Sequence, residues 1–160
     1  MEHATPASVL LTLLFVGPVL WYIWRAKRGA RLFVRRIPGI DAIDDTIGRS
    51  VEVGRLVSFT SGLTGVGPLL YACLWVLRYI ARKTAIFNSR LLVPCNDPEA
   101  LALTDATLQN AYRSEKKFSQ YDPSSLRFLS EEQFAYASGY MGIMHRENVG
   151  GAFLFGRFAA

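Results

Sequence analysis

The 160-residue chain has room for one modest domain and a short additional segment. Its apolar fraction of 51% is slightly high and its charged fraction of 19% slightly low for a soluble domain, as expected if part of the chain is a membrane segment. The net charge of +5 comes from one basic run beside an apolar stretch, so we expect no nucleic-acid partner. Cys73 and Cys95 belong to no CxxC or Cys/His cluster, so we expect no metal site and two reduced thiols.

The first element is an uncharged apolar stretch from Ala4 to Trp24. It is long enough to cross the roughly 30 Å core of a bilayer as a helix, and Trp21 and Tyr22 gather near its end, as interfacial aromatics do. A secretory signal peptide would carry basic residues before the apolar stretch, whereas here they follow it. We therefore predict a retained transmembrane anchor over residues 1–24.

A basic juxtamembrane stem over residues 25–39 follows the anchor. Under the positive-inside rule its cations place the stem and the domain after it, residues 40–160, in the cytoplasm, with the short N-terminus outside. We therefore predict a single-pass membrane protein. The membrane-orienting residues are Arg25, Lys27, Arg28, Arg31, Arg35 and Arg36.

The domain opens with a helical pattern, because Ile40, Ile43, Ile47 and Val51 recur at three- and four-residue spacing before Gly54. This spacing predicts an amphipathic helix with one apolar stripe toward the core. Aspartates near its start suit the positive end of the helix dipole.

A predicted strand over residues 55–61 leads into a glycine-rich loop, FTSGLTGVGPLL, residues 59–70. Ligands of α/β folds bind after the carboxyl ends of strands, but the order G-x-x-G-x-G reverses the dinucleotide fingerprint, and no Lys-Ser/Thr pair follows as in a P-loop. We expect a turn that lets an apolar helix pack closely, so that a bulky residue at Gly65 destabilises the domain. Ligand binding is the alternative, with weak candidates Ser61, Gly62, Thr64, Gly65 and Gly67.

The apolar run LLYACLWVLRYIA, residues 69–81, has two interpretations. It is short for a membrane span, contains Arg78, and is followed by Arg82 and Lys83, which a second span would place outside. We favour a buried helix in the cytoplasmic domain. A second span or a re-entrant segment is the alternative.

The remaining chain alternates strands with helices. Strand patterns at residues 89–95, 124–130 and 152–158 enclose two helical patterns, so the domain is predicted to be an α/β fold. We expect a small, mainly parallel βαβαβαβ sheet, Rossmann-like, with helices on both faces. A parallel sheet that ends on a bare strand is expected to need further chain or a partner to complete it.

Two helix starts carry capping signals. Asp97 can cap the first helix with Pro98 in its first turn. Ser130 with Gln133 makes a capping box for the second helix.

No constellation of catalytic residues emerges from the sequence. His145 lies near a helix end, where a positive side chain is favoured by the helix dipole. Asp44 and Asp45 are adjacent, so they do not face each other as an acid–base pair. We therefore expect a protein that is not an enzyme and that carries no cofactor.

Three segments resemble an uncharacterised family of bacterial inner-membrane proteins, catalogued as a domain of unknown function. They are IPGIDAIDDTIGRSVEVGR at residues 37–55, RLLVPCNDPE at 90–99 and RFLSEEQFAYASGYMGIMHRE at 127–147. The resemblance covers most of residues 25–158. It implies an inner-membrane location with an N-terminal span and an α/β domain, and it implies no activity. The chain departs from the family pattern in its glycine loop, which lacks an acidic residue, and in stopping before further strands and a C-terminal span.

Our leading hypothesis is a structural or assembly subunit, a scaffold that docks on other membrane-protein subunits or on itself through the cytoplasmic domain. The apolar helix at residues 69–81 is its main support, because apolar side chains surround more of the helix than one sheet face can cover. The phenylalanine-rich strand at residues 152–158 adds to the expectation that the chain needs a partner or the bilayer. The alternative is a ligand-binding or sensing module that uses the glycine-rich loop.

Overall fold

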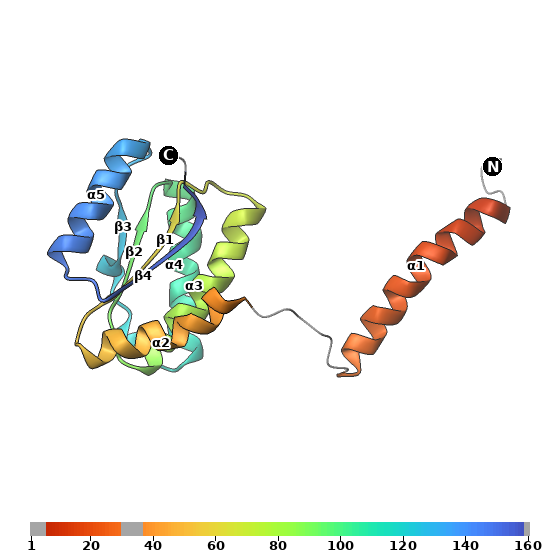
Figure 1. Ribbon diagram of the computed structural model, residues 1–160, viewed down its shortest axis with the longest axis horizontal. Coiled ribbons are helices and arrows are strands. Elements are labelled where there is room, and N and C mark those ends of the chain that lie inside the picture. The colour runs from red at the N-terminus through yellow and green to blue at the C-terminus, as the bar shows by residue number, and fades with distance from the viewer. Residues whose placement is uncertain (1–5, 30–36, 159–160) are drawn as a thin grey trace. The chain divides into compact units, whose positions relative to one another are not determined.

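The computed structural model describes residues 6–29 and 37–158 (Figure 1). The chain divides into two units, with the boundary between Ile37 and Pro38. The first unit contains one helix, and the second is the α/β domain.

Helix α1, Pro6–Lys27, forms the first unit, and none of its described residues is buried. Among the described residues it is the one helix long and apolar enough to cross a membrane. Pro18 lies inside it, as membrane helices tolerate. The helix runs past the predicted end at residue 24, and Arg25 and Arg28 lie over its indole rings. The other predicted orienting residues, Arg31, Arg35 and Arg36, lie outside the described residues.

The domain is built on a four-stranded sheet in the order β3-β2-β1-β4, in which all three pairings are parallel. The parallel sheet confirms the prediction from the alternating pattern. In the register Val57 of β1 lies opposite both Leu91 of β2 and Gly151 of β4. The strands are β1 Val57–Gly62, β2 Leu91–Cys95, β3 Leu126–Phe128 and β4 Gly151–Arg157.

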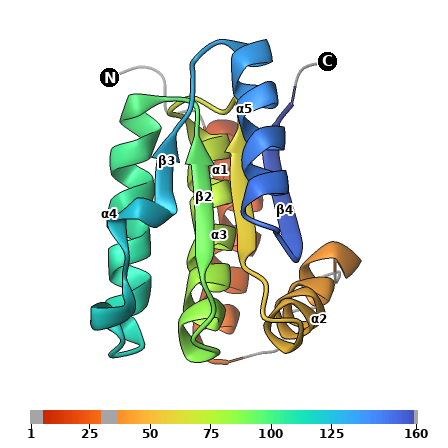
Figure 2. The same ribbon diagram turned by 90° about the vertical axis from the view of Figure 1, so that its left-hand side faces the viewer.

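Helices cover both faces of the sheet, as predicted (Figure 2). Helices α3, Pro68–Ile86, and α4, Pro98–Ser114, pack side by side on one face. Helix α5, Gln133–Arg146, lies on the other face, and α2, Pro38–Glu52, lies toward the amino ends of the strands.

Alternation along β1 divides the core between the two faces. Val57 and Phe59 are buried in the main cluster with α2, α3 and α4. Thr60 instead bonds to α5, and a smaller cluster on this face joins Leu92 to Ile143 of α5. The domain therefore has a large core on the α3–α4 side and a thinner one beneath α5.

Helix α3 is a core helix of the domain, as the favoured interpretation of residues 69–81 expects. Leu70, Leu77 and Ile80 are completely buried against the sheet. The opposite side of α3 stays open, since Tyr71 exposes 53% and Trp75 70% of its surface.

Of the two predicted helix caps, the one for α4 is correct and the one for α5 is wrong. Asp97 caps α4 as predicted, with its Oδ1 accepting from the backbone N–H of Glu99 at 2.8 Å. The predicted capping box at Ser130 is wrong, because α5 begins two residues later, with Glu132 at its N-cap. Ser130 Oγ instead accepts from the backbone N–H of Glu132 at 3.1 Å.

Strand β3 is shorter than the predicted strand at residues 124–130. Its first part folds as a 3₁₀ turn, Pro123–Ser125, because Asp122 caps that turn through the N–H of Ser124. A second 3₁₀ turn, Phe118–Gln120, joins it to α4.

Candidate functional site

The glycine-rich loop lies at the carboxyl end of β1, beside the point where the strand order turns from β2 to β4. Open α/β sheets bind ligands in the crevice at such a point. Here the end of β4 bonds to the start of the loop. The backbone N–H of Leu63 donates to the carbonyl of Arg157 at 2.9 Å, and the ladder between the two strands shifts register between Thr60 and Gly62.

Two glycines make this close approach between β1 and β4 feasible. Gly62 has φ +63°, and a Cβ there would lie 2.6 Å from the carbonyl oxygen of Arg157. Gly156 of β4 has φ +137°, and a Cβ there would lie 2.1 Å from the carbonyl oxygen of Ser61. Only glycine fits both the backbone conformation and the space.

The loop hydroxyl that we considered for ligand binding is held within the fold. Thr64 Oγ1 donates to the carbonyl of Ser61 at 2.6 Å and accepts from the backbone N–H of Arg157 at 2.9 Å. Ser61 and Thr64 are both buried. These bonds fasten the loop to β4, and binding of a ligand by the loop stays a prediction.

The crowding expected from a bulky residue at Gly65 stays a prediction, but a methyl group would fit there. A Cβ at Gly65 would meet only Asp97 Oδ2, at an ordinary distance of 3.6 Å, because the loop is open there. Gly67 precedes α3 as its N-cap, in an extended conformation and with no side-chain cap. Where the loop meets β4, the crowded glycines are Gly62 and Gly156.

A cluster of buried hydroxyl groups lies between β1 and α5. The hydroxyls of Thr60 and Tyr136 share a short hydrogen bond, and that of Tyr136 also donates to the carbonyl of Pro94 at 3.2 Å. The hydroxyls of Ser58 and Tyr140 are buried near each other, and neither makes a well-formed hydrogen bond within residues 6–29 and 37–158. The rings of Tyr136 and Tyr140 stack with centroids 6.3 Å apart.

Burial controls the ionisation of this region. It raises the pKa of Tyr136 to about 12, and the hydrogen bond from Thr60 offsets only part of that effect. Burial likewise raises the pKa of the Cys95 thiol to about 11. A neutral phenol and a neutral thiol are poor nucleophiles, so burial does not activate either group for nucleophilic attack at neutral pH.

The other residues considered for catalysis are dispersed. His145 is exposed in the last turn of α5. Asp44 binds Lys83 Nζ at 2.9 Å and the hydroxyl of Tyr79 at 2.9 Å, which ties α2 to α3. The hydrogen bond from Lys83 lowers the pKa of Asp44. Within the described ranges no group of three or more His, Cys, Asp or Glu residues could hold a metal ion.

An open groove of about 260 Å³ lies between α3 and α4. Helix α3 contributes Tyr71, Trp75 and Arg78, which recur at four- and three-residue spacing and so share one side of the helix. The Arg78 guanidinium carbon lies 5.6 Å from the centre of the Trp75 ring. Residues from α4 form the other wall, namely Leu103, Ala106, Thr107 and Asn110.

The composition of this groove matches that of protein-binding surfaces. Tryptophan, tyrosine and arginine are the residues that dominate the energetics of protein interfaces. Sequence reasoning included Trp75 in an apolar helix but missed Tyr71 and Arg78 as its neighbours. The spacing of the three residues could have indicated the groove, although their direction depends on which side of α3 meets the sheet.

The chain matches the family described as Domain of unknown function (DUF6754) over residues 2–160. It belongs to this family. Membership agrees with the resemblance to an uncharacterised family that three sequence segments indicated. No curated protein and no solved structure gives a significant match. The surface of this DUF6754 chain is therefore the place to look for its binding partners.

Proposed function

We propose that this protein is a membrane-anchored structural or assembly subunit of a bacterial inner-membrane complex. In this proposal α1 spans the membrane with its N-terminus outside, and the α/β domain is cytoplasmic. The apolar composition and full exposure of α1 support the anchor. The basic residues after its apolar stretch, Arg25, Lys27 and Arg28, support the orientation.

The groove between α3 and α4 carries the docking part of the proposal. Trp75 exposes 70% of its surface beside Tyr71 and Arg78, and a monomeric protein gains nothing from leaving these side chains in water. An apolar partner segment would bury the indole ring, and an acidic residue on it could pair with Arg78. The partner would be another membrane-protein subunit or a second copy of this chain.

The test is site-specific photocrosslinking of the full chain in native membranes. A crosslinker at Ala106, on the wall of the groove, should capture the same single protein species in every repeat of the experiment. A crosslinker at Ser138, exposed on α5, is the matched control and should not capture it. Trp75→Ala should weaken the capture, since truncating an interface tryptophan typically costs about 2 kcal/mol or more.

Two outcomes would contradict the proposal. Capture that is equal from Ala106 and Ser138 would show that the groove has no preference for a partner. Capture from Ala106 that persists in Trp75→Ala would show that the indole ring is not the docking residue. Crosslinking to a second copy of the chain would identify self-association.

A further inference from the structure

A second exposed surface lies where α3 and α4 end, at the amino ends of the strands (Figure 2). Its apolar side chains, Ile86, Phe87 and Phe118, expose 47%, 46% and 44% of their surfaces. Cations stand among them. We define the amino-edge surface by Ile86, Phe87, Arg90, Lys116, Lys117 and Phe118.

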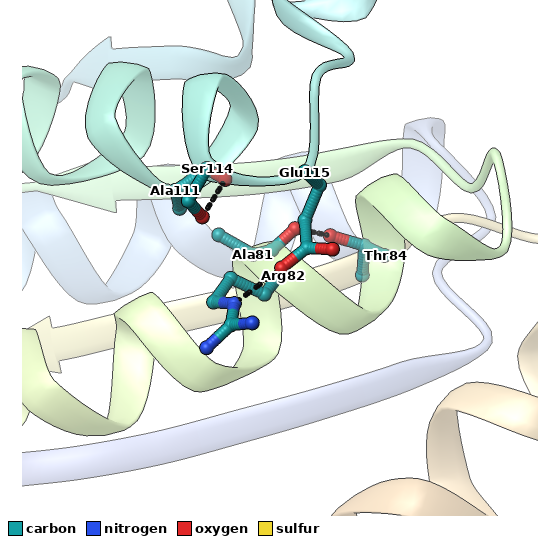
Figure 3. A network of polar contacts seen from close by, with 6 residues as sticks. All are labelled: Ala81, Arg82, Thr84, Ala111, Ser114 and Glu115. Atoms are coloured by element: carbon teal, nitrogen blue, oxygen red, sulfur yellow. Dashed lines mark hydrogen bonds and ion pairs between the residues drawn. The ribbon is translucent and has the colours of Figure 1, made fainter.

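Hydrogen bonds hold the parts of this surface together. Lys117 Nζ donates to the carbonyl of Ile86 at 3.1 Å and to Asn88 Oδ1 at 2.6 Å, so the turn after α4 is fixed to the turn after α3. The Arg82–Glu115 ion pair joins the two helix ends as well (Figure 3). The surface is therefore assembled by the fold itself.

The cations of this surface differ in how they are used. Lys117 is committed to the bonds just described, whereas Arg90 and Lys116 are exposed and form no ion pair among the described residues. Asp122 lines a cavity of about 300 Å³ together with Arg90 and Arg127, so it offsets part of the local positive charge. Beside them, the Arg113 guanidinium lies 4.6 Å from the centre of the Phe118 ring.

Exposed aromatic rings with interspersed cations suit the interface of an anionic membrane. Aromatic rings favour the headgroup level, and lysine and arginine are attracted to anionic headgroups. The short covalent connection to α1 keeps the domain within reach of the membrane that α1 is proposed to span. Only residues 30–36 separate Gly29 from Ile37, and eight peptide steps reach at most about 28 Å.

We propose that the amino-edge surface docks the domain on anionic lipid headgroups of the membrane that α1 spans. Phe87 and Phe118 would lie at headgroup level, and Arg90 and Lys116 would contact lipid phosphates. This inference goes beyond the proposed protein docking, because it uses a different surface and a different partner. It shares with that proposal only the membrane span.

The experiment uses the full chain in phosphatidylcholine vesicles with and without phosphatidylglycerol. A fluorophore on Ser119→Cys, beside Phe118, reports contact with a quencher carried on lipid headgroups. The native thiols, Cys73 and Cys95, are buried and are protected from labelling. A second fluorophore on Glu131→Cys, at the carboxyl edge of the sheet, is the control.

We expect quenching at position 119 in vesicles that contain phosphatidylglycerol, and little at position 131. Arg90→Glu or Lys116→Glu should lower the ratio of docked to free domain by about thirtyfold, since each unit of charge near an anionic surface changes this ratio about fivefold and a charge reversal changes two units. Arg157→Glu makes the same charge change at the carboxyl edge and should have no effect. Because Lys116 is exposed, its variant remains informative if Arg90→Glu fails to fold.

Equal quenching at positions 119 and 131 would overturn the proposal. So would quenching at position 119 that is the same with and without phosphatidylglycerol and is unchanged in Arg90→Glu and Lys116→Glu. Its failure is distinguishable from failure of the groove. Trp75→Ala should leave headgroup quenching unchanged, and Arg90→Glu should leave crosslinking from Ala106 unchanged.

Discussion

The glycine loop after β1 and the groove between α3 and α4 lie in one small domain and have opposite characters. At the loop, Gly62 and Gly156 bring two strand ends into contact, and Thr64 satisfies two backbone groups. At the groove, Trp75 and Tyr71 project from a helix whose other side is completely buried. The start of the loop, which looks functional in sequence, is fastened to β4, whereas the helix that looks like core has one side open to solvent.

This contrast shows what a glycine pattern indicates and what it does not. Glycines are selected wherever backbone must approach closely, whether the approaching group is a phosphate or another strand. The partner of Gly62 in the sheet is Arg157, far along the chain, so the reason for the glycine at position 62 becomes visible only in three dimensions. The exposure of aromatic residues is likewise visible only in three dimensions. The spacing of residues shows that they share one side of a helix, but not whether that side faces the core or the solvent.

The largest expected effect is that of Gly156→Ala. A Cβ there would lie 2.1 Å from the carbonyl oxygen of Ser61 in a backbone conformation that alanine disfavours. We expect a loss of about 3 kcal/mol or more in the free energy of unfolding. Urea denaturation of the full chain in mild detergent measures it.

Gly142→Ala is the matched control. Gly142 lies within α5 with open space around its Cα, so alanine should stabilise the domain by up to about 1 kcal/mol. Equal stability of Gly156→Ala and the parent protein would show that β4 does not close the crevice beside β1.

Much of the fold could be predicted from the sequence, because its signals are local. The spacing of Ile43 and Ile47 gave α2, and Asp97 with Pro98 gave the start of α4. Alternation of these elements then implied the parallel sheet, since a helix between two strands favours a parallel crossover.

The rest depended on contacts between distant residues. The hydroxyl of Tyr136 reaches Thr60 across the sheet, and the aspartate that shortens β3, Asp122, competes with strand formation through a local turn. The groove needed the orientation of α3. Sequence reasoning therefore located the elements better than it located the surface that functions.

A smaller effect is expected beneath α5, where Tyr136→Phe removes a satisfied hydroxyl. Thr60 and Pro94 would each lose a hydrogen-bonding partner, which should cost about 1–2 kcal/mol of stability. Tyr140→Phe is the control, because its buried hydroxyl makes no well-formed hydrogen bond to the described part of the chain and interacts with the neighbouring Ser58 hydroxyl, so its removal should cost less than that of the Tyr136 hydroxyl. The same urea titrations compare them, and equal losses in both variants would contradict the assignment of these bonds.

Alkaline pH should produce a comparable or smaller loss. Burial raises the pKa of Cys95 from 9.0 to about 11, so the folded state keeps the proton where the unfolded chain releases it. This contribution to stability is complete below pH 9 and is lost as the pH rises toward 11. The loss amounts to about 1.4 kcal/mol at about pH 10. Stability measured against pH in Cys95→Ala should be flatter over this range. An unchanged slope would assign the loss to other groups.

The smallest expected effect on stability is that of Trp75→Ala. Because 70% of the Trp75 surface is exposed, its removal forfeits little burial and one exposed contact with Arg78. We expect the free energy of unfolding to change by no more than about 0.5 kcal/mol. Its neighbour Leu74, buried on the same helix, is the control, and Leu74→Ala should cost about 2–5 kcal/mol.

Comparing Trp75→Ala with Leu74→Ala tests whether the Trp75 side chain is exposed in the free chain. If Trp75→Ala destabilises the isolated chain as much as Leu74→Ala, the indole ring is buried in solution, by a second copy or by the membrane. Repeating the titration at several protein concentrations separates those two causes, because only self-association makes stability depend on concentration. A small, concentration-independent change would leave Trp75 open in the free chain, as a docking residue requires.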